Sequence, residues 1–332
     1  MGFLKQLVLD DIALQHLKVL RDIQEFIGFI EPYYPDLKVN DYTIEEIEMA
    51  LYHIFFKLIG KIISFSPLNM RRFLKDYLLK YEIMNIKQII LGLIIGMTNE
   101  EKSKNVNFLI EEYLENTDFI KKLIEISSLE EIQLYMKKTI YNKAIREGIL
   151  YFKNNNEIFV LEAFLDQLYY FILLRRENMY NKKEKNMISL FNSFKTEIYN
   201  INLMYRGIIN GIDKNLLSQF IVNNYLFLDE NKINVLLDQK NLNDFFLELD
   251  IILRKIIELK YFINISEEEH PMWELERLYE QYYFKKVKIT FEDIEHLTIY
   301  RILELIIKKE KEINLEIIPN VVRIINRKFK SL

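Results

Sequence analysis

Three stretches of this sequence share one short pattern and decide its fold: Tyr81-Glu82-Ile83-Met84-Asn85-Ile86-Lys87, Thr196-Glu197-Ile198-Tyr199-Asn200-Ile201-Asn202 and Lys311-Glu312-Ile313-Asn314-Leu315-Glu316. The three asparagines are 115 and 114 positions apart. A constant period indicates one structural unit used three times, and a unit of about 110 residues has the size of a small domain. The sequence therefore predicts three similar units, residues 1–115, 116–225 and 226–332, arranged with pseudo-threefold symmetry as a funnel.

Residues on either side of the motif repeat as well. A Leu-Tyr pair precedes every copy, at Tyr52, Tyr169 and Tyr279. The first two copies end on two glycines, Gly92 and Gly96 or Gly207 and Gly211, which predict helix ends. The third copy has Pro319 in that region, and it has one residue fewer between its Glu and its Asn. The repeat is therefore strong twice and degraded once.

The composition predicts an all-α protein. The 332 residues include only 8 Gly and 5 Pro, so the chain is poor in turn formers and consists mostly of long elements. Apolar residues recur at helical spacing, and the predicted helices include 3–30, 43–66, 69–97, 99–114, 157–180 and 184–211. Capping boxes are predicted at Thr43 with Glu46 and at Thr290 with Asp293.

Charge and hydropathy exclude several classes of protein. The net charge is −4, with 45 basic and 49 acidic side chains interspersed, so no basic stripe for a nucleic acid is present. The start of the chain lacks the pattern of a secretory signal. The longest uninterrupted apolar run, 89–97, is far shorter than the roughly 18 to 20 residues that a membrane span needs. We therefore expect no nucleic-acid partner and no direct insertion into a membrane.

No catalytic constellation is visible in the sequence. The chain has no Cys, and no two of its four His stand at the spacing of metal ligands. No glycine-rich phosphate-binding loop and no nucleophile motif occurs. The sequence therefore predicts a protein without enzymatic activity, cofactor, metal or bound nucleotide.

The repeated Asn and Glu allow two interpretations. The favoured one is structural: Asn is unfavourable inside a helix, so it would cap a new helix at a kink. The functional one is a polar contact with a neighbouring unit or a partner protein. With a cap at Asn, Glu would lie in the last turn of the preceding helix, where the macrodipole disfavours an acid, and a basic partner such as Arg71, Arg72 or Arg206 is predicted.

These residues resemble the C subunits of the V-type (A-type) ATPases and ATP synthases, the counterparts of the eukaryotic d subunit. That family repeats an acid, then Asn-Ile or Asn-Leu, then an apolar stretch closing on Gly. Residues 80–96 and 195–211 look like its first two copies, and 273–327 looks like its last. The first forty residues lack the family's usual aromatic and arginine-bearing opening.

The resemblance implies a non-catalytic rotor subunit on the cytoplasmic face of a membrane. It would stand on the membrane ring of ion-carrying subunits, receive the central shaft in its cavity, and transmit torque for proton or sodium transport. The alternatives are a helical scaffold or adaptor unrelated to rotary motors, and an enzyme whose site is not visible in the sequence. Residues predicted at partner or inter-unit contacts are Arg71, Arg72, Glu82, Asn85, Lys87, Glu197, Asn200, Arg206, Glu312, Asn314 and Arg323.

Overall fold

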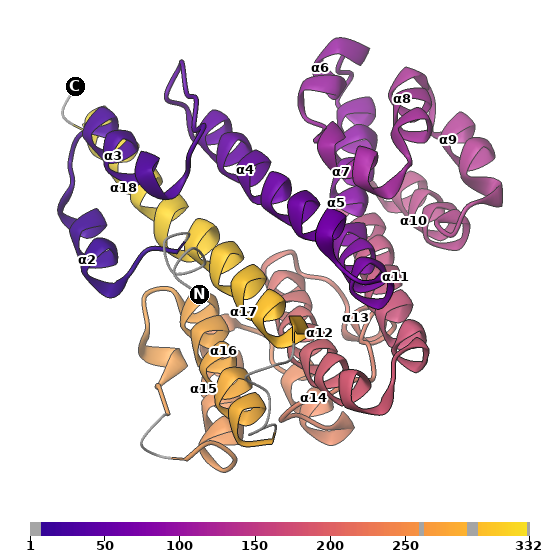
Figure 1. The fold of residues 1–332 in the computed structure, drawn as a ribbon. Helices are drawn as coiled ribbons and strands as arrows, with labels where there is room; N and C mark the ends of the chain where they lie inside the picture. The colour runs from indigo at the N-terminus through magenta and orange to yellow at the C-terminus, as the bar shows by residue number, and fades with distance from the viewer. Residues whose placement is uncertain (1–7, 259–261, 291–297, 331–332) are drawn as a thin grey trace. The chain divides into compact units, whose positions relative to one another are not determined.

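The chain is built from helices and their connecting loops (Figure 1). Its structure, a computed structural model, describes residues 8–258, 262–290 and 298–330, and these residues contain no strand. The all-α prediction is therefore confirmed. Spatial contacts divide the chain into two compact units: unit 1 comprises 1–75, 107–115 and 296–332, and unit 2 comprises 76–106 and 116–295. The division into three similar units stays a prediction.

Unit 1 brings both ends of the chain together. Its N-terminal elements contact the C-terminal helix, since α3 and α4 both pack on α18. The elements are α2 (Asp11–Val19), α3 (Ile23–Ile30), the 3-10 turn η1 (Glu31–Tyr33), α4 (Ile44–Phe65), the start of α5 (Leu68–Ile94), α7 (Phe108–Leu114), α17 (Thr298–Lys311), the π-helical segment η7 (Glu312–Ile317) and α18 (Ile318–Lys330).

Helix α4 is the central element of unit 1, and its buried residues follow helical periodicity. Ile47, Leu51, Phe55 and Ile59 are fully buried and recur every four residues, so they form one apolar stripe. Further along the helix, Gly60 allows α7 to approach closely, because a Cβ at this position would lie 2.1 Å from the Tyr113 ring. The stripe and the glycine together fix α4 against its neighbours in unit 1.

The start of α4 only partly follows the predicted capping box. The Thr43 side chain accepts a hydrogen bond from the Glu46 backbone N–H, as predicted. The Glu46 carboxylate instead accepts from the backbone N–H groups of Asn40 and Asp41, each at 2.7 Å. The second predicted box, at Thr290 and Asp293, extends beyond the described residues.

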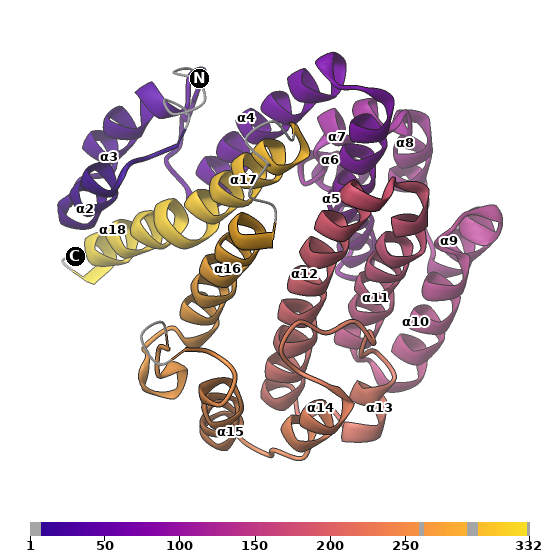
Figure 2. The same cartoon turned by 60° about the horizontal axis from the view of Figure 1, so that its bottom comes forward.

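Unit 2 is a set of packed helical hairpins. Helices α10 and α11 lie side by side, and α12 packs against α11, α15 and α16 (Figure 2). The elements beyond the remainder of α5 are α6 (Asn99–Lys104), α8 (Thr117–Glu125), α9 (Leu129–Tyr135), η2 (Met136–Lys138), α10 (Asn142–Asn155), α11 (Ile158–Arg176), η3 (Glu177–Met179), α12 (Lys182–Ile209), α13 (Lys214–Ser218), α14 (Glu230–Leu237), α15 (Leu242–Arg254), η5 (Ile265–Glu267) and α16 (Pro271–Thr290).

The predicted glycine helix ends are confirmed at α5 and α12. Gly96 and Gly211 have φ of 79° and 65°, the left-handed region that glycine adopts without strain. The N–H of the next residue bonds the carbonyl of the earlier glycine, with Met97 donating to Gly92 at 2.8 Å and Ile212 donating to Gly207 at 2.9 Å. Both ends are therefore Schellman motifs.

Two predicted helices are broken by polar caps. The predicted helix 3–30 begins outside the described residues, and its described part contains α2 and α3 as separate helices. The Asp22 side chain accepts from two backbone N–H groups and begins the second of them. The predicted helix 99–114 falls into α6 and α7, and Asn107 caps the second of these. A short polar side chain that binds the backbone locally competes with helix continuation.

Candidate functional site

The repeated motif lies inside long helices in its first two copies. Helix α5 continues through Asn85, and α12 continues through Asn200. Both asparagines are buried, as are Glu82 and Glu197 before them. The prediction that Asn caps a new helix is therefore wrong. The α12 pair has polar partners outside the helix, so these side chains do not compete for the helix's own backbone.

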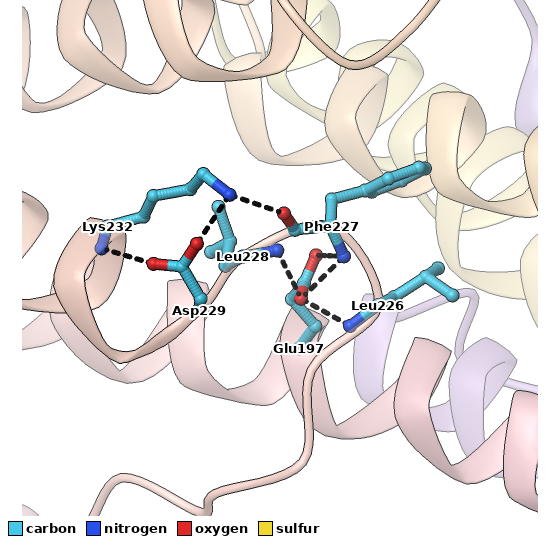
Figure 3. A network of polar contacts seen from close by, with 6 residues as sticks. All are labelled: Glu197, Leu226, Phe227, Leu228, Asp229 and Lys232. Atoms are coloured by element: carbon cyan, nitrogen blue, oxygen red, sulfur yellow. Dashed lines mark hydrogen bonds and ion pairs between the residues drawn. The ribbon is translucent and has the colours of Figure 1, made fainter.

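The Glu197 carboxylate accepts hydrogen bonds from three consecutive backbone N–H groups of the loop before α14 (Figure 3). Its carboxylate accepts from the backbone N–H groups of Leu226 at 2.6 Å and of Phe227 and Leu228 at 3.0 Å. The Tyr279 hydroxyl donates to the same carboxylate at 2.6 Å. Burial raises the pKa of Glu197, and these four donors oppose that rise.

Asn200 holds the same loop one helical turn further on. Its side-chain amide donates to the Val222 carbonyl at 2.9 Å, and its side-chain oxygen accepts from the Val222 N–H at 3.0 Å. The neighbouring Tyr199 hydroxyl donates to the Phe220 carbonyl. The second copy of the motif thus binds the backbone of residues 220–228 at three places, and the loop leads into α14, which Asp229 caps.

Glu82 makes the corresponding contact in the first copy. Its two carboxylate oxygens accept from the side-chain amide of Asn116 at 3.0 and 3.2 Å. Asn116 is the N-cap residue of α8. Burial raises the pKa of Glu82, and hydrogen bonds from Asn116 and Tyr141 oppose the rise. Glu82 therefore fixes the start of α8.

Glu312 joins the two ends of the chain in the third copy. Its carboxylate accepts from the Leu9 backbone N–H at 2.6 Å and from the Tyr34 hydroxyl at 2.5 Å. Lys309 donates to it at 2.8 Å and also lies 3.6 Å from the centroid of the Tyr34 ring. Burial lowers the pKa of Lys309, whereas burial and the adjacent Glu312 raise that of Tyr34. In the same copy Asn314 accepts from Tyr52 at 2.7 Å.

The degraded spacing of the third copy coincides with the π-helical segment η7. Pro319 has no N–H to give to the carbonyl four residues earlier, and its ring would clash with that carbonyl in a regular α-helix. The preceding turn is widened instead, and the Ile318 N–H bonds the Ile313 carbonyl five residues back. A π-helix relieves this conflict.

The three glutamates share one structural role. Each binds the chain at or directly before the N-terminus of a short helix: Glu82 at the cap of α8, Glu197 before α14, and Glu312 at Leu9 before the α2 cap Asp10. For the third copy this segment is the N-terminal part of the chain. The geometry that the three copies share is that of a buried loop clamp.

The predicted arginine partners are wrong. Arg71 donates through Nε to the Ser66 carbonyl, and Arg72 is exposed. Arg206 pairs with Glu162 at 2.5 Å. Among the described residues, the basic side chain that donates to a motif Glu is Lys309, which no sequence pattern marked as a partner.

The other predicted residues also have internal contacts. Lys87 pairs with Asp166 at 2.6 Å. Arg323 donates to the carbonyls of Leu17 and Leu20, which lie in the last turn and at the C-cap of α2, where a cation is favourable. Contacts of these residues with other proteins stay predictions.

Some partners of the motif carried a sequence signal and others did not. Two of the three tyrosines in the repeated Leu-Tyr pair, Tyr52 and Tyr279, donate hydrogen bonds to motif residues. Asn116, Leu9 and Tyr34 had no such mark, because they are joined to the motif only by the tertiary fold. In the described parts of the chain, no helix is long and apolar enough to cross a membrane, and no cluster of three or more potential metal ligands occurs.

Comparison with known proteins gives a consistent result. A family model described as ATP synthase (C/AC39) subunit matches residues 3–323. The C subunit of the A-type ATP synthase of Methanocaldococcus jannaschii is 26% identical over 221 residues, 64% of this chain and 53% of that protein. The corresponding protein of Thermococcus kodakarensis is 25% identical over 304 residues, 88% of this chain and 76% of that protein. The chain thus spans about half the length of the first relative.

Proposed function

Because this chain belongs to the ATP synthase (C/AC39) subunit family, we propose that it is a non-catalytic rotor subunit of a V-type (A-type) rotary ATPase. It links the central shaft to the membrane ring of ion-carrying subunits and transmits torque for ATP-coupled transport of protons or sodium ions. It acts on the cytoplasmic face of the membrane. The observation that carries this proposal is the family match over residues 3–323, supported by relatives named as C subunits of A-type ATP synthases.

The proposed shape is a funnel of three similar helical units. Three copies of one motif at a constant spacing support it. So does the common role of Glu82, Glu197 and Glu312, each of which binds the chain at the start of a short helix. Equivalent side chains with equivalent contacts are expected of a repeated unit.

A torque-transmitting part needs stiffness, and the motif supplies it. Helix α12 has 28 residues, which corresponds to about 40 Å at 1.5 Å per residue. Its buried Glu197 and Asn200 fix a loop through several hydrogen bonds to its backbone. A satisfied buried polar network makes a core rigid and specifies one arrangement.

Five of the motif residues are occupied by internal bonds: Glu82, Glu197, Asn200, Glu312 and Asn314. Partner proteins are therefore expected to contact exposed positions outside the motif. Among the predicted residues, Arg71 and Arg72 are exposed. Lys87, Arg206 and Arg323 are only partly exposed and hold internal partners. A role for these three with a partner protein would require those bonds to remain in the complex.

Direct binding to purified central-shaft proteins tests the proposal. We expect a stable complex, measured by calorimetry and by size-exclusion chromatography, and no ATP binding by the isolated chain at micromolar nucleotide. A helical scaffold unrelated to rotary motors would form no complex with the shaft. Absence of a complex at protein concentrations of tens of micromolar would therefore contradict the proposed function.

A further inference from the structure

The turn between α4 and α5 carries the most exposed large apolar side chain among the described residues. Phe65, the last residue of α4, is 91% exposed, and Leu68, the first residue of α5, is 61% exposed. We call residues 61–72 the α4–α5 corner; its two helices are shown in Figure 2. Phe65 and Leu68 lie three residues apart in the sequence, and both are exposed. An apolar contact outside the chain would bury them and so stabilise the bound state.

The same corner is purely basic. Lys61, Arg71 and Arg72 are exposed within it, and the sequence has no acid between Glu48 and Asp76. Neither Lys61 nor Arg72 forms an ion pair with any of the described residues. Of the acids of the packed helix α7 and its cap, Glu115 pairs with Lys75, Glu112 lies near His53, and Glu111 is buried. The corner therefore presents positive charge together with its apolar tip.

The turn is held in shape from within. The Arg71 Nε donates to the Ser66 carbonyl at 2.7 Å, and the Ser66 hydroxyl donates to the Ile62 carbonyl at 2.6 Å. Phe65 and Leu68 thus stay at the tip without contributing to the core. Their exposure is a property of the folded turn.

The order of residues along the two helices matches the layers of a membrane surface. Lys61 precedes Phe65 by four residues and Arg72 follows Leu68 by four, so each cation stands about 6 Å behind the tip along its helix. Interfacial segments bury their apolar residues about 5–10 Å below the headgroups while their cations bind the lipid phosphates. A protein partner with an apolar pocket for Phe65 and Leu68 would not require a cation on each helix at the same distance from the tip, whereas a flat lipid surface would.

We propose that the α4–α5 corner docks on an anionic phospholipid surface, with Phe65 and Leu68 in the interface and Lys61 and Arg72 on the phosphates. This contact is peripheral and independent of the assignment to a rotary motor. Each basic residue near such a surface contributes about fivefold in affinity. Burial of part of a Phe side chain contributes about tenfold.

Sedimentation of the full chain with lipid vesicles tests the proposal. The wild type should bind phosphatidylglycerol–phosphatidylcholine vesicles and not pure phosphatidylcholine vesicles. Binding should weaken as NaCl rises from about 0.1 M to about 1 M, because the Debye length falls from about 10 Å to about 3 Å. Equal binding to both vesicles, or to neither, overturns the proposal.

Matched variants locate the contact. Lys61→Glu with Arg72→Glu should weaken vesicle binding at least about 25-fold, and Phe65→Ser should weaken it about tenfold. The control Lys121→Glu with Lys122→Glu makes the same charge change at exposed positions of α8 and should alter binding by less than about twofold. An equal loss in the control overturns the proposal. The proposal is also overturned if Phe65→Ser weakens binding to the central-shaft proteins and leaves vesicle binding unchanged, because the α4–α5 corner would then dock on a protein. Circular dichroism checks that each variant is folded.

Discussion

Replacing Glu197 with Ala removes the acceptor that four donors share. The backbone N–H groups of Phe227 and Leu228 are buried with their residues and would lose their partner, while Leu226 is partly exposed and can be hydrated. The buried hydroxyl of Tyr279 would lose the same acceptor. Each buried orphan N–H costs about 1–3 kcal/mol. With the Tyr279 hydroxyl counted alike, three buried donors give about 3–9 kcal/mol, so we expect a loss of about 6 kcal/mol in the free energy of unfolding.

Two measurements check this value. Urea denaturation followed by circular dichroism gives the free energy of unfolding, and hydrogen exchange reports the amides of residues 226–228 directly. The control is Glu162→Ala, which breaks the partly exposed pair with Arg206 and should cost about 1 kcal/mol or less. If Glu197→Ala destabilises no more than this control, or if the amides of 226–228 stay protected, the loop-clamp reasoning is refuted.

Three further predictions concern glycine packing, a buried acid and the chain ends. Gly207→Ala places a Cβ 2.5 Å from the Leu217 side chain and should lower the free energy of unfolding by about 1–3 kcal/mol, measured by denaturation. In the control Gly28→Ala the new Cβ meets nothing within 4 Å, so this variant should raise the free energy of unfolding by about 0.5–1 kcal/mol. An equal effect at both glycines would argue against the close packing at Gly207. Burial raises the pKa of Glu82 in the folded state, so the folded protein binds the proton at higher pH than the unfolded chain does. The free energy of unfolding of the wild type minus that of Glu82→Gln should therefore increase as pH falls from 7 through the raised pKa. A decrease of this difference over the same pH range would contradict the prediction. Arg323→Ala removes the donor to the last carbonyls of α2 and should lower the free energy of unfolding by about 1–3 kcal/mol. Amide hydrogen exchange should become faster in α2 before it does elsewhere. Unchanged exchange in α2 would show that other contacts hold the N-terminal segment.

The helical class and the ends of the main helices could be predicted from sequence because their signals are local. The two glycine pairs marked the Schellman ends of α5 and α12 correctly, since backbone geometry there depends on a few neighbouring residues. The breaks at Asp22 and Asn107 were missed, although both are ordinary capping residues, because the apolar periodicity around them continues.

The role of the repeated motif could not be predicted, because its partners are distant in sequence. Glu312 binds Leu9, 303 positions away, and no local rule points from one to the other. Local propensity favoured Asn as a cap, and tertiary contacts overrode it: Asn200 satisfies the Val222 backbone instead. The recurrence of Tyr52 and Tyr279 was the one usable signal.

Ion transport by a rotary complex with and without this chain tests the central claim most directly. In membrane vesicles that contain the complete complex, ATP should drive the uptake of protons or sodium ions. Without this chain, that uptake should be lost while ATP hydrolysis by the detached head persists, because the head carries the catalytic subunits and this chain is proposed only to couple them to the ring. Full ATP-driven uptake by a complex that lacks the chain would contradict the account.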